Sequence, residues 1–460
     1  MSLGLPFGLR ERGIAVMETG RYPLDWIDAY AAAIREFVVV RPADNLLIKV
    51  PNEAYRLNSS GVRILQTLFS GGRVDDLWAT HGRTEMVRRD LYEFFTGLKQ
   101  VLQGCVDESN PPPGVTRVNF TLPFSTLPVL AEVAVTGRCN LACKFCYAAC
   151  SCRASTAPGR EMTGPEIRRV LDVIHHDAQV PSVSFTGGEP CLRANLAGLV
   201  AYAHGLGLRV NLITNGTRVT PALARDLAAA GLASAQVSLE APDAATHDRL
   251  TTVAGSFDAT LAGIAALLAA GIRVHTNTTM NRLNLDRLTA MPAFVRGLGL
   301  TRLSMNLMIP AGTAAAGMGD LVVRYTELPG IIPGLAAAAR AAGVEFMWYS
   351  PTPVCLFNPL AHRLGNKGCA ACDGLLSVDS AGNVLPCSSW PEPVGSLLDT
   401  PFAGVWNSAR AAWIRAKRCA PSVCDGCPDF TLCQGACPLY WDQCGHAELA
   451  PKEAGYVPAT

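Results

Sequence analysis

Short apolar runs alternate with amphipathic stretches between about residues 129 and 350. Six of these runs have the length and β-branched content of strands. They are Ala131–Val135, Ser182–Phe185, Arg209–Ile213, Ser234–Leu239, Arg273–Thr278 and Arg302–Leu307. Helical periodicity lies between them, near 164–177, 193–205, 221–230, 256–270 and 285–298. This order predicts parallel βα units, closed or partly closed into a barrel, with the chemistry at the carboxyl ends of the strands.

A different pattern precedes this region, at residues 36–104, and predicts a small winged-helix-like module. Three short runs have the composition of strands, and three longer stretches have helical periodicity. The strands are Phe37–Val40, Leu46–Val50 and Tyr55–Leu57, and the helices begin after Asn58, near Val74 and near Thr84. The proline-rich segment Asp107–Gly114 is typical of a linker because proline cannot continue a helix.

The composition narrows the class of protein. The chain has 460 residues, enough for two or three domains, of which 49% are hydrophobic and 17% charged. The net charge of +1 gives no attraction to polyanions, so a nucleic-acid partner is not expected. Apolar stretches such as Leu261–Ile272 are too short to span a bilayer, and the N-terminus lacks a signal-peptide pattern. We therefore expect a cytoplasmic protein with no membrane partner.

The seventeen cysteines are unevenly placed. Five lie between Cys139 and Cys152, and nine lie between Cys369 and Cys444. Thiols stay reduced in the cytosol, where clustered cysteines bind metal more often than they form disulfides. After Ser350 the regular periodicity fades, so residues 351–448 are interpreted as a domain held together by metal. The pattern predicts two separate metal regions.

The first region, Cys139-x3-Cys143-x2-Cys146, follows directly on the first predicted barrel strand. Three thiolates on one loop can hold three irons of a [4Fe–4S] cluster and leave the fourth iron open to a ligand. A structural zinc loop is the alternative, although zinc sites usually pair two C-x2-C motifs.

This loop resembles the signature of the radical S-adenosylmethionine (radical SAM) enzymes. The resemblance implies a partial (β/α)6 TIM-like barrel at residues 129–350. It places Phe145 against the adenine of S-adenosylmethionine. Thr186-Gly187-Gly188-Glu189-Pro190 resembles the family's GGEP motif, which holds the methionine amino group. The glycines are expected to let the backbone approach the ligand, and Glu189 to accept hydrogen bonds from the ammonium.

Ser238-Leu239-Glu240, at the end of the fourth predicted strand, resembles the family's ribose-contacting segment, and Ser238 is carried over as a cofactor contact. Glu240 departs from the aspartate usual there. Thr214-Asn215-Gly216-Thr217 is consistent with the third strand end of the family, but also with an ordinary turn. The implied chemistry is reductive cleavage of S-adenosylmethionine to a 5′-deoxyadenosyl radical that abstracts hydrogen from a substrate. An electron donor such as flavodoxin or ferredoxin is implied as a partner.

The second cysteine region resembles the SPASM extension, which implies two auxiliary [4Fe–4S] clusters. By that resemblance the first auxiliary cluster uses Cys372, Cys387 and Cys437, with Cys369 or Cys355 as the fourth ligand. The second uses Cys424, Cys427 and Cys433, with Cys444 or Cys419 as the last ligand. A zinc ribbon is the alternative. The other cysteines, among them Cys105, Cys150, Cys152 and Cys191, are interpreted as packing residues.

The 36–104 module resembles the peptide-recognition element of peptide-modifying radical enzymes. That resemblance implies that a leader peptide adds a strand to the exposed edge of the small sheet. A DNA-binding winged helix and a packing domain without a ligand are the alternatives.

The hypothesis is therefore a maturase of a ribosomally synthesised precursor peptide. Ser388-Ser389 after Cys387 counts against formylglycine formation, because sulfatase-maturing relatives carry an aspartate there. A radical enzyme for a small molecule such as a tetrapyrrole and a non-catalytic iron–sulfur regulator remain as alternative functions.

Overall fold

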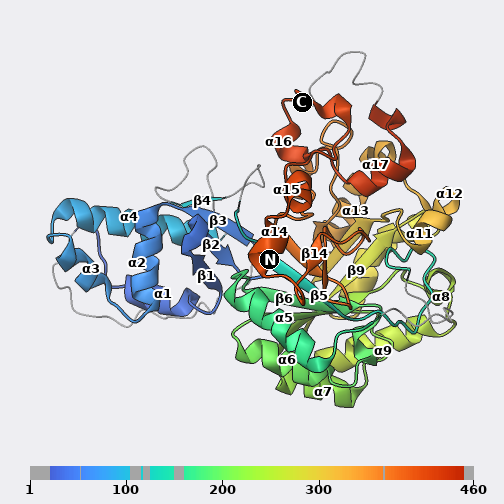
Figure 1. The fold of residues 1–460 in the computed structure, drawn as a ribbon, viewed down its shortest axis with the longest axis horizontal. Coiled ribbons are helices and arrows are strands. Elements are labelled where there is room, and N and C mark those ends of the chain that lie inside the picture. Colours follow the sequence, from blue (N-terminus) through green and yellow to red (C-terminus); the bar gives the residue numbers. More distant parts are fainter. Residues whose placement is uncertain are drawn as a thin grey trace. The chain divides into compact units, whose positions relative to one another are not determined.

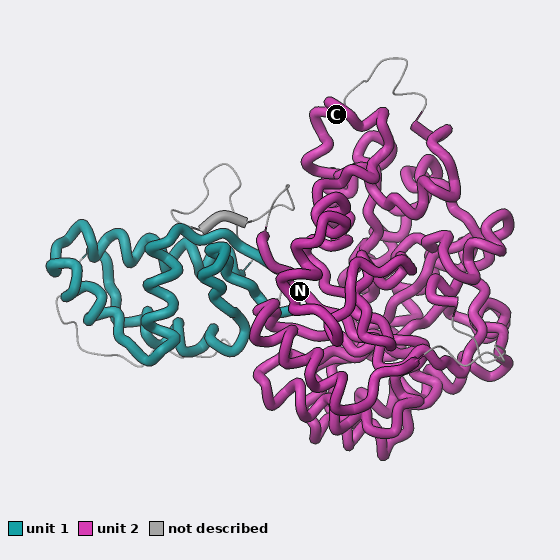
Figure 2. The backbone as a smooth tube through the Cα atoms, in the orientation of Figure 1, with its two compact units in different colours: residues 1–119 teal, residues 120–460 magenta. Residues whose placement is uncertain are grey.

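The computed structural model describes residues 21–51, 53–103, 115–117, 125–149, 160–365 and 368–449. The chain divides into two compact units, residues 1–119 and residues 120–460, coloured separately in Figure 2. The linker predicted at 107–114 and the cysteines Cys105, Cys150 and Cys152 lie outside the described residues.

The first unit contains a four-stranded antiparallel sheet in the order β1-β2-β3-β4 (Figure 1). Its strands are β1 (Val38–Arg41), β2 (Leu46–Lys49), β3 (Glu53–Leu57) and β4 (Val115–Arg117). Its helices are α1 (Ile27–Ile34), α2 (Ser59–Phe69), α3 (Val74–Thr80) and α4 (Glu85–Leu102). The three predicted strands and three predicted helices are present; α1 and β4 come from segments outside the predicted module.

Local sequence explains these elements. The side chain of Asn58 accepts a hydrogen bond of 2.7 Å from the amide of Gly61, so Asn58 caps α2 as expected. Thr84 caps α4 in the same way through the amide of Val87. Leu65 and Phe95, which lie on these two helices, are fully buried in the core of the unit. Arg41 and Asp44 form a buried ion pair at the turn between β1 and β2.

The second unit is built on a ten-stranded sheet in the order β11-β10-β9-β8-β7-β6-β5-β12-β13-β14. Strands β5 to β11 run parallel to their neighbours, β12 is parallel to β5, and the pairs β12–β13 and β13–β14 are antiparallel. The strands are β5 (Leu130–Thr136), β6 (Ser182–Gly187), β7 (Arg209–Thr214), β8 (Leu232–Ser238), β9 (Arg273–Met280), β10 (Arg302–Leu307), β11 (Glu345–Trp348), β12 (Leu375–Val378), β13 (Asn383–Leu385) and β14 (Gly395–Ser396). The predicted α/β fold with a parallel sheet of the partial-barrel type is confirmed.

Figure 1 shows helices α5, α6, α7 and α9 on one side of this sheet. The helices of the barrel region are α5 (Gly164–His176), α6 (Leu196–Gly205), α7 (Pro221–Ala229), α8 (Ala244–Thr251), α9 (Ser256–Ala269), α10 (Met291–Gly297), α11 (Thr313–Ala316), α12 (Met318–Leu321) and α13 (Leu328–Ala342). The C-terminal region carries α14 (Phe402–Trp406), α15 (Ala409–Arg415), α16 (Phe430–Cys433) and α17 (Pro438–Cys444).

The two faces of the parallel sheet differ in chemistry. Residues such as Val210, Leu212 and Val237 are fully buried in the main core. Alternate residues on the same strands are polar and bond to one another, as the hydroxyl of Ser234 does to Asn211 at 2.8 Å. A barrel interior that carries polar side chains instead of packed aliphatic ones is suited to a ligand.

No single helix in the described ranges is long and apolar enough to cross a membrane. Helices α8 and α9 meet the length and composition test only as a pair, and they are bent by 101° at the break between them.

Candidate functional site

The loop with Cys139, Cys143 and Cys146 leaves the carboxyl end of β5 and is bonded to several neighbouring elements. The carboxylate of Glu161 accepts hydrogen bonds from the Thr136 hydroxyl (2.7 Å) and the Gly137 amide (2.8 Å) at the start of the loop. In its middle, the amides of Ala142 and Lys144 donate to carbonyls at the end of α8, at 3.1 and 3.0 Å. At its end, the carbonyl of Cys146 accepts a 2.8 Å hydrogen bond from the Thr313 amide. The protein therefore fixes this loop through its backbone and leaves the thiols for a ligand.

The three thiols lie within electrostatic range of one another. Burial raises the pKa of Cys143 well above its usual value, and Glu240, Cys146 and Cys139 raise it further. Burial likewise raises the pKa of Cys139 to about 11, against the lowering effect of the Leu141 amide, and Glu189 and Cys146 add to the rise. Desolvated thiols of this kind need a cation to stabilise their thiolates, which an iron–sulfur cluster supplies. The structure thus brings together all three cysteines predicted to hold the first cluster.

Gly187 and Gly188 are required by the protein's own backbone. A Cβ at Gly187 would lie 2.1 Å from the carbonyl oxygen of Thr136, and one at Gly188 would lie 2.1 Å from that of Arg138. The amides of Gly188 and Glu189 bond to the same two carbonyls at 2.9 and 2.7 Å. These contacts join the glycine segment to the start of the cysteine loop, and the approach of the glycine backbone to the ligand stays a prediction.

The side chain of Glu189 is held by the protein at the strand ends. It is fully buried, and its carboxylate accepts hydrogen bonds from the Thr214 hydroxyl (2.7 Å), the Asn215 amide (2.8 Å) and the Cys191 amide (2.9 Å). Burial raises the pKa of Glu189, and these donors lower it. Glu189 thus joins the ends of β6 and β7, and its contact with the ammonium group stays a prediction. Thr186 and Pro190, on either side of the motif, are buried as well.

The segment Thr214–Thr217, which the sequence left ambiguous, belongs to the site. The Asn215 amide group lies 4.0 Å from the sulfur of Cys139 and donates to the Asn140 side chain at 3.1 Å. The Asn140 side chain in turn donates to the Thr217 hydroxyl at 2.8 Å. The feature of the sequence that indicates this role is the position of the segment at a strand end, in spite of its turn-like composition.

The remaining cofactor-site candidates lie at the same end of the sheet. Ser238 is the last residue of β8, and Phe145 packs at the edge of the main core. Glu240 is buried, and its carboxylate accepts a 2.8 Å hydrogen bond from the Thr279 amide. Burial raises the pKa of Glu240 to about 8, against the lowering effect of that amide.

The cysteines of the C-terminal region divide into two groups. Cys369, Cys372 and Cys387 pack around one small core with Trp390. Burial raises the pKa of Cys387 well above its usual value, and after burial the largest causes are Cys369 and Cys437. The structure thus brings together Cys369, Cys372, Cys387 and Cys437, the four residues predicted for the first auxiliary cluster.

The second group is less complete. The Cys427 amide donates to the Cys424 carbonyl at 3.1 Å, and Cys433 ends α16. Cys444 ends α17, and its carbonyl accepts a 3.2 Å hydrogen bond from Arg324. Burial raises the pKa of Cys444, Arg324 and Tyr440 lower it, and Glu448 raises it.

Comparison with known families decides the identity. Residues 133–291 match the Radical SAM superfamily, and residues 369–428 match SPASM, an iron-sulfur cluster-binding domain. The chain is a radical SAM enzyme with a SPASM domain. The matched ranges contain the Cys139 loop and most of the C-terminal cysteines. S-adenosylmethionine, a [4Fe–4S] cluster and SPASM iron–sulfur chemistry follow from this membership.

The relatives of this radical SAM enzyme differ in substrate. AdoMet-dependent heme synthase of Nitratidesulfovibrio vulgaris is 29% identical over 317 residues, which cover 64% of this chain and 85% of that protein. PqqA peptide cyclase of Xanthomonas campestris is 29% identical over 322 residues, 67% of this chain and 82% of that protein. The fold resembles Streptococcus suis SuiB bound to precursor peptide SuiA, with a TM-score of 0.64 and 16% identity over 88% of this chain and 95% of that one.

The donor set of the enzyme fits an iron–sulfur cluster. Among the residues that the structure describes, no three His, Cys, Asp or Glu side chains converge closely enough for a single metal ion. The sulfurs that hold a [4Fe–4S] cluster bind separate irons and do not converge on one point. Three neighbouring, partly buried thiols on a loop bonded through its backbone meet that requirement.

A carboxyl group that the sequence did not reveal lies between the barrel and the SPASM domain. Glu132 on β5 pairs in register with Ser377 on β12. Burial raises the pKa of Glu132 to about 7, and a hydrogen bond from Ser388 lowers it. Ser388 follows Cys387, so Glu132 lies close to the cysteine group predicted for the first auxiliary cluster.

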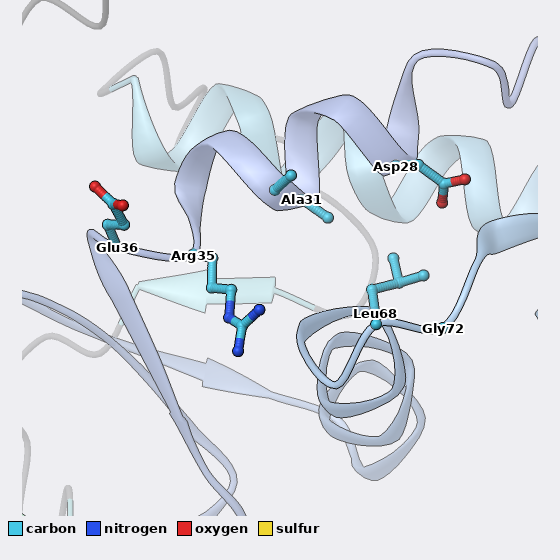
Figure 3. A pocket seen from close by; sticks show the side chains of 8 residues that line it. Asp28, Ala31, Arg35, Glu36, Leu68 and Gly72 are labelled. Atoms are coloured by element: carbon cyan, nitrogen blue, oxygen red, sulfur yellow. The ribbon is translucent and has the colours of Figure 1, made fainter. Parts of the chain in front are cut away.

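The first unit carries a cavity of about 590 Å³ between α1 and the end of α2 (Figure 3). Ala31 on α1 and Leu68 and Gly72 at the end of α2 line opposite sides of it, and Arg35 and Glu36 line it at the end of α1. Glu36 immediately precedes Phe37 and β1, so the cavity adjoins the outer strand of the small sheet.

Proposed function

We propose that this radical SAM enzyme modifies a ribosomally synthesised precursor peptide. The match to peptide-bound SuiB carries the proposal, because it covers 88% of this chain. The part left outside that match is smaller than the 119 residues of the first unit, so the match includes part of that unit. Heme synthase matches 64% of the chain, which the second unit alone can supply. A first unit shared with a peptide-binding relative favours a peptide substrate.

In this proposal each site residue has a defined role. Cys139, Cys143 and Cys146 hold the radical cluster, and one side of S-adenosylmethionine lies against the strand ends. The residues assigned to that side are Phe145, Thr186, Gly187, Gly188, Glu189, Pro190 and Ser238. The assigned auxiliary ligands are Cys369, Cys372, Cys387, Cys424, Cys427, Cys433, Cys437 and Cys444, for two [4Fe–4S] clusters.

The chain's own residues position the reactants. When bound, the radical cluster supplies the electron that cleaves S-adenosylmethionine. Glu189 fixes the end of β6 to β7, which would hold the Gly187–Glu189 segment in place for the methionine ammonium. The polar inner face of the sheet receives the substrate segment, and the surrounding barrel limits contact of the radical with water. Flavodoxin or ferredoxin is the proposed electron donor, in the reducing cytoplasm.

The leader peptide is proposed to add a strand at the outer edge of β1. The edge of β3 is already paired with β4, whereas within the described residues β1 has a strand on one side only. The amide of Val50 donates to the carbonyl of Phe37, so by antiparallel alternation Val38 and Val40 turn their backbone groups outward. Phe37 and Val39 are exposed apolar residues at this edge, which a docked peptide would cover.

The experiment is leader binding by the reconstituted enzyme. The probe is the short precursor encoded beside this chain, fluorescently labelled. Val40→Pro removes one outward amide without breaking the β1–β2 ladder, and we expect at least tenfold weaker binding. Val115→Pro, on β4 at the opposite edge, is the matched control and should bind as the wild type does. If the wild type, Val40→Pro and Val115→Pro bound the leader with equal affinity, the proposal that the leader binds at the edge of β1 would be contradicted.

The second candidate is a radical SAM enzyme acting on a tetrapyrrole. Its support is the 27–29% identity to heme synthases from three organisms, against 16% to SuiB. Deletion of residues 1–119 separates the two functions. Turnover of a tetrapyrrole by the truncated enzyme favours the second candidate, whereas loss of peptide modification with intact cleavage of S-adenosylmethionine favours the first.

A further inference from the structure

Three segments of the SPASM region are joined near Cys369 by hydrogen bonds, an ion pair and packing contacts. The ammonium of Lys417 donates to the Cys369 carbonyl at 2.5 Å and pairs with Asp373 at 3.2 Å, and both side chains are buried. The guanidinium of Arg415 donates to the Cys372 carbonyl at 2.7 Å. These bonds hold the segment that leads to Cys419 against the Cys369–Asp373 segment.

The third segment packs against the other two. A Cβ at Gly435 would lie 2.5 Å from the Cβ of Ala420, the residue after Cys419. A Cβ at Gly368 would lie 2.8 Å from the side-chain oxygen of Gln434. The approach to Cys437 therefore touches residues next to both Cys369 and Cys419. Cys419 also packs on the same small core as Cys369, Cys372 and Cys387.

Cys369 is the common neighbour of the other thiols in this group. Burial and then Cys369 raise the pKa of Cys419 to about 11. The same two causes, in the same order, raise the pKa of Cys437 to about 12. Burial, opposed by Arg415, raises the pKa of Cys372 to about 12, and Cys369 adds to that rise. Asp442 acts on both Cys419 and Cys437, which places these two thiols near one carboxylate.

The first auxiliary site thus has five thiols, one more than a [4Fe–4S] cluster binds. Cys369, Cys372, Cys387 and Cys419 pack on one small core, and the electrostatic effect of Cys369 on Cys437 connects Cys437 to the same group. Lys417 and Arg415 join the segment before Cys419 to the carbonyls of Cys369 and Cys372. Cys372 also has a left-handed backbone, with φ of 51°, a conformation that costs a non-glycine residue free energy.

We propose that Cys419 is a ligand-competent thiol of the first auxiliary cluster and that it is interchangeable with Cys372 in the fourth ligand position. Cys369, Cys387 and Cys437 are then the fixed ligands. This assignment rests on the proposed function only in taking the group as an iron–sulfur site. It moves Cys419 away from the second auxiliary group, where it was the alternative to Cys444.

The test removes the radical cluster so that only auxiliary iron remains. In a Cys139→Ala, Cys143→Ala, Cys146→Ala background, the anaerobically reconstituted full-length chain is analysed for iron per chain and by Mössbauer and electron paramagnetic resonance spectroscopy. Cys372→Ala and Cys419→Ala should each keep the iron of the background, with shifted spectra. The double variant should lose about four irons, as should Cys387→Ala alone. Cys355→Ala, the matched control, should leave both iron and spectra unchanged.

Several outcomes overturn the inference. These are loss of the cluster in either single variant, its retention in the double variant, or loss of iron in Cys355→Ala. A background protein that binds no iron at all contradicts the proposed auxiliary clusters instead. The two failures are therefore distinguishable without any measurement of activity.

Discussion

The amide of Thr313 donates a 2.8 Å hydrogen bond to the carbonyl of Cys146. Gly312, the residue before, has a φ of 56°, and a Cβ built on it would lie 2.3 Å from the carbonyl oxygen of Tyr147. The connection after β10 is therefore packed directly on the end of the cysteine loop. A residue far along the chain from the CxxxCxxC motif determines where its third thiol lies.

Gly312→Ala should displace that loop. The added methyl group overlaps backbone atoms that cannot rotate away, and the backbone of Gly312, with φ 56° and ψ −132°, lies in a region that only glycine adopts readily. We expect the variant to fold but to lose most of its radical-cluster iron, measured as iron per chain after anaerobic reconstitution. Gly319→Ala in α12 is the control, because a Cβ there meets nothing within 4 Å. Wild-type iron content in Gly312→Ala would show that the contact does not hold the loop.

Glu189→Gln should weaken both stability and cofactor binding. The carboxylate accepts three hydrogen bonds, and a glutamine must turn its amide N–H toward one of those donors. A loss of about 2 kcal/mol in the free energy of unfolding is expected from the mismatched buried group. Denaturant unfolding and equilibrium binding of S-adenosylmethionine measure the two effects. Asp226→Asn, on the exposed side of α7, should change neither.

The strands of the barrel can be predicted from the sequence because hydrophobic periodicity and the spacing of apolar runs are local properties of the chain. The six strands predicted from apolar runs are all present, with ends shifted by a few residues at most. The partners of the strands are not local. Strand β12 pairs with β5 although more than 200 residues separate them, and no pattern in either segment encodes that contact.

The site shows the same division. The spacing of Cys139, Cys143 and Cys146 indicates a cluster-binding loop because the three cysteines are close together in the sequence. The sequence alone does not explain why residue 188 is glycine. The requirement comes from the carbonyl of Arg138, which a Cβ at Gly188 would overlap. Likewise, the sequence left Cys369 and Cys355 as alternatives, because fold contacts and not spacing bring Cys369 to Cys387 and Cys437.

The stability of the second unit should depend on pH through His275. Burial lowers the pKa of His275 to about 4, and the nearby cations Arg302 and Arg209 lower it further; its ring nitrogen lies 3.2 Å from the Gln236 oxygen. The unfolded state therefore binds a proton that the folded state does not between about pH 6.5 and pH 4. Across that window the contribution of His275 to the unfolding free energy should fall as the pH falls, by up to about 3 kcal/mol, which the difference between the wild type and His275→Gln isolates.

His275→Gln should flatten this part of the profile, because glutamine keeps a hydrogen-bonding group but does not titrate. Denaturant unfolding at a series of pH values gives the slope for each protein. His81→Gln, at an exposed position in the first unit, should keep the wild-type slope. Parallel profiles for the wild type and His275→Gln would contradict the assignment of the slope to this residue.

Asp44→Ala should unfold the first unit while leaving the second unit loaded with iron. Arg41 and Asp44 pair at 2.8 Å with side chains 1% and 4% exposed, so removal of the carboxylate leaves a buried guanidinium without its partner. Breaking such a pair costs about 3–5 kcal/mol, whereas replacing both members by apolar residues costs little. We therefore expect Asp44→Ala to lose leader binding and become sensitive to protease before residue 119, with unchanged iron per chain. The double variant Arg41→Met, Asp44→Leu should recover protease resistance. If the double variant were as sensitive as the single one, the loss would come from a feature of Asp44 other than its charge.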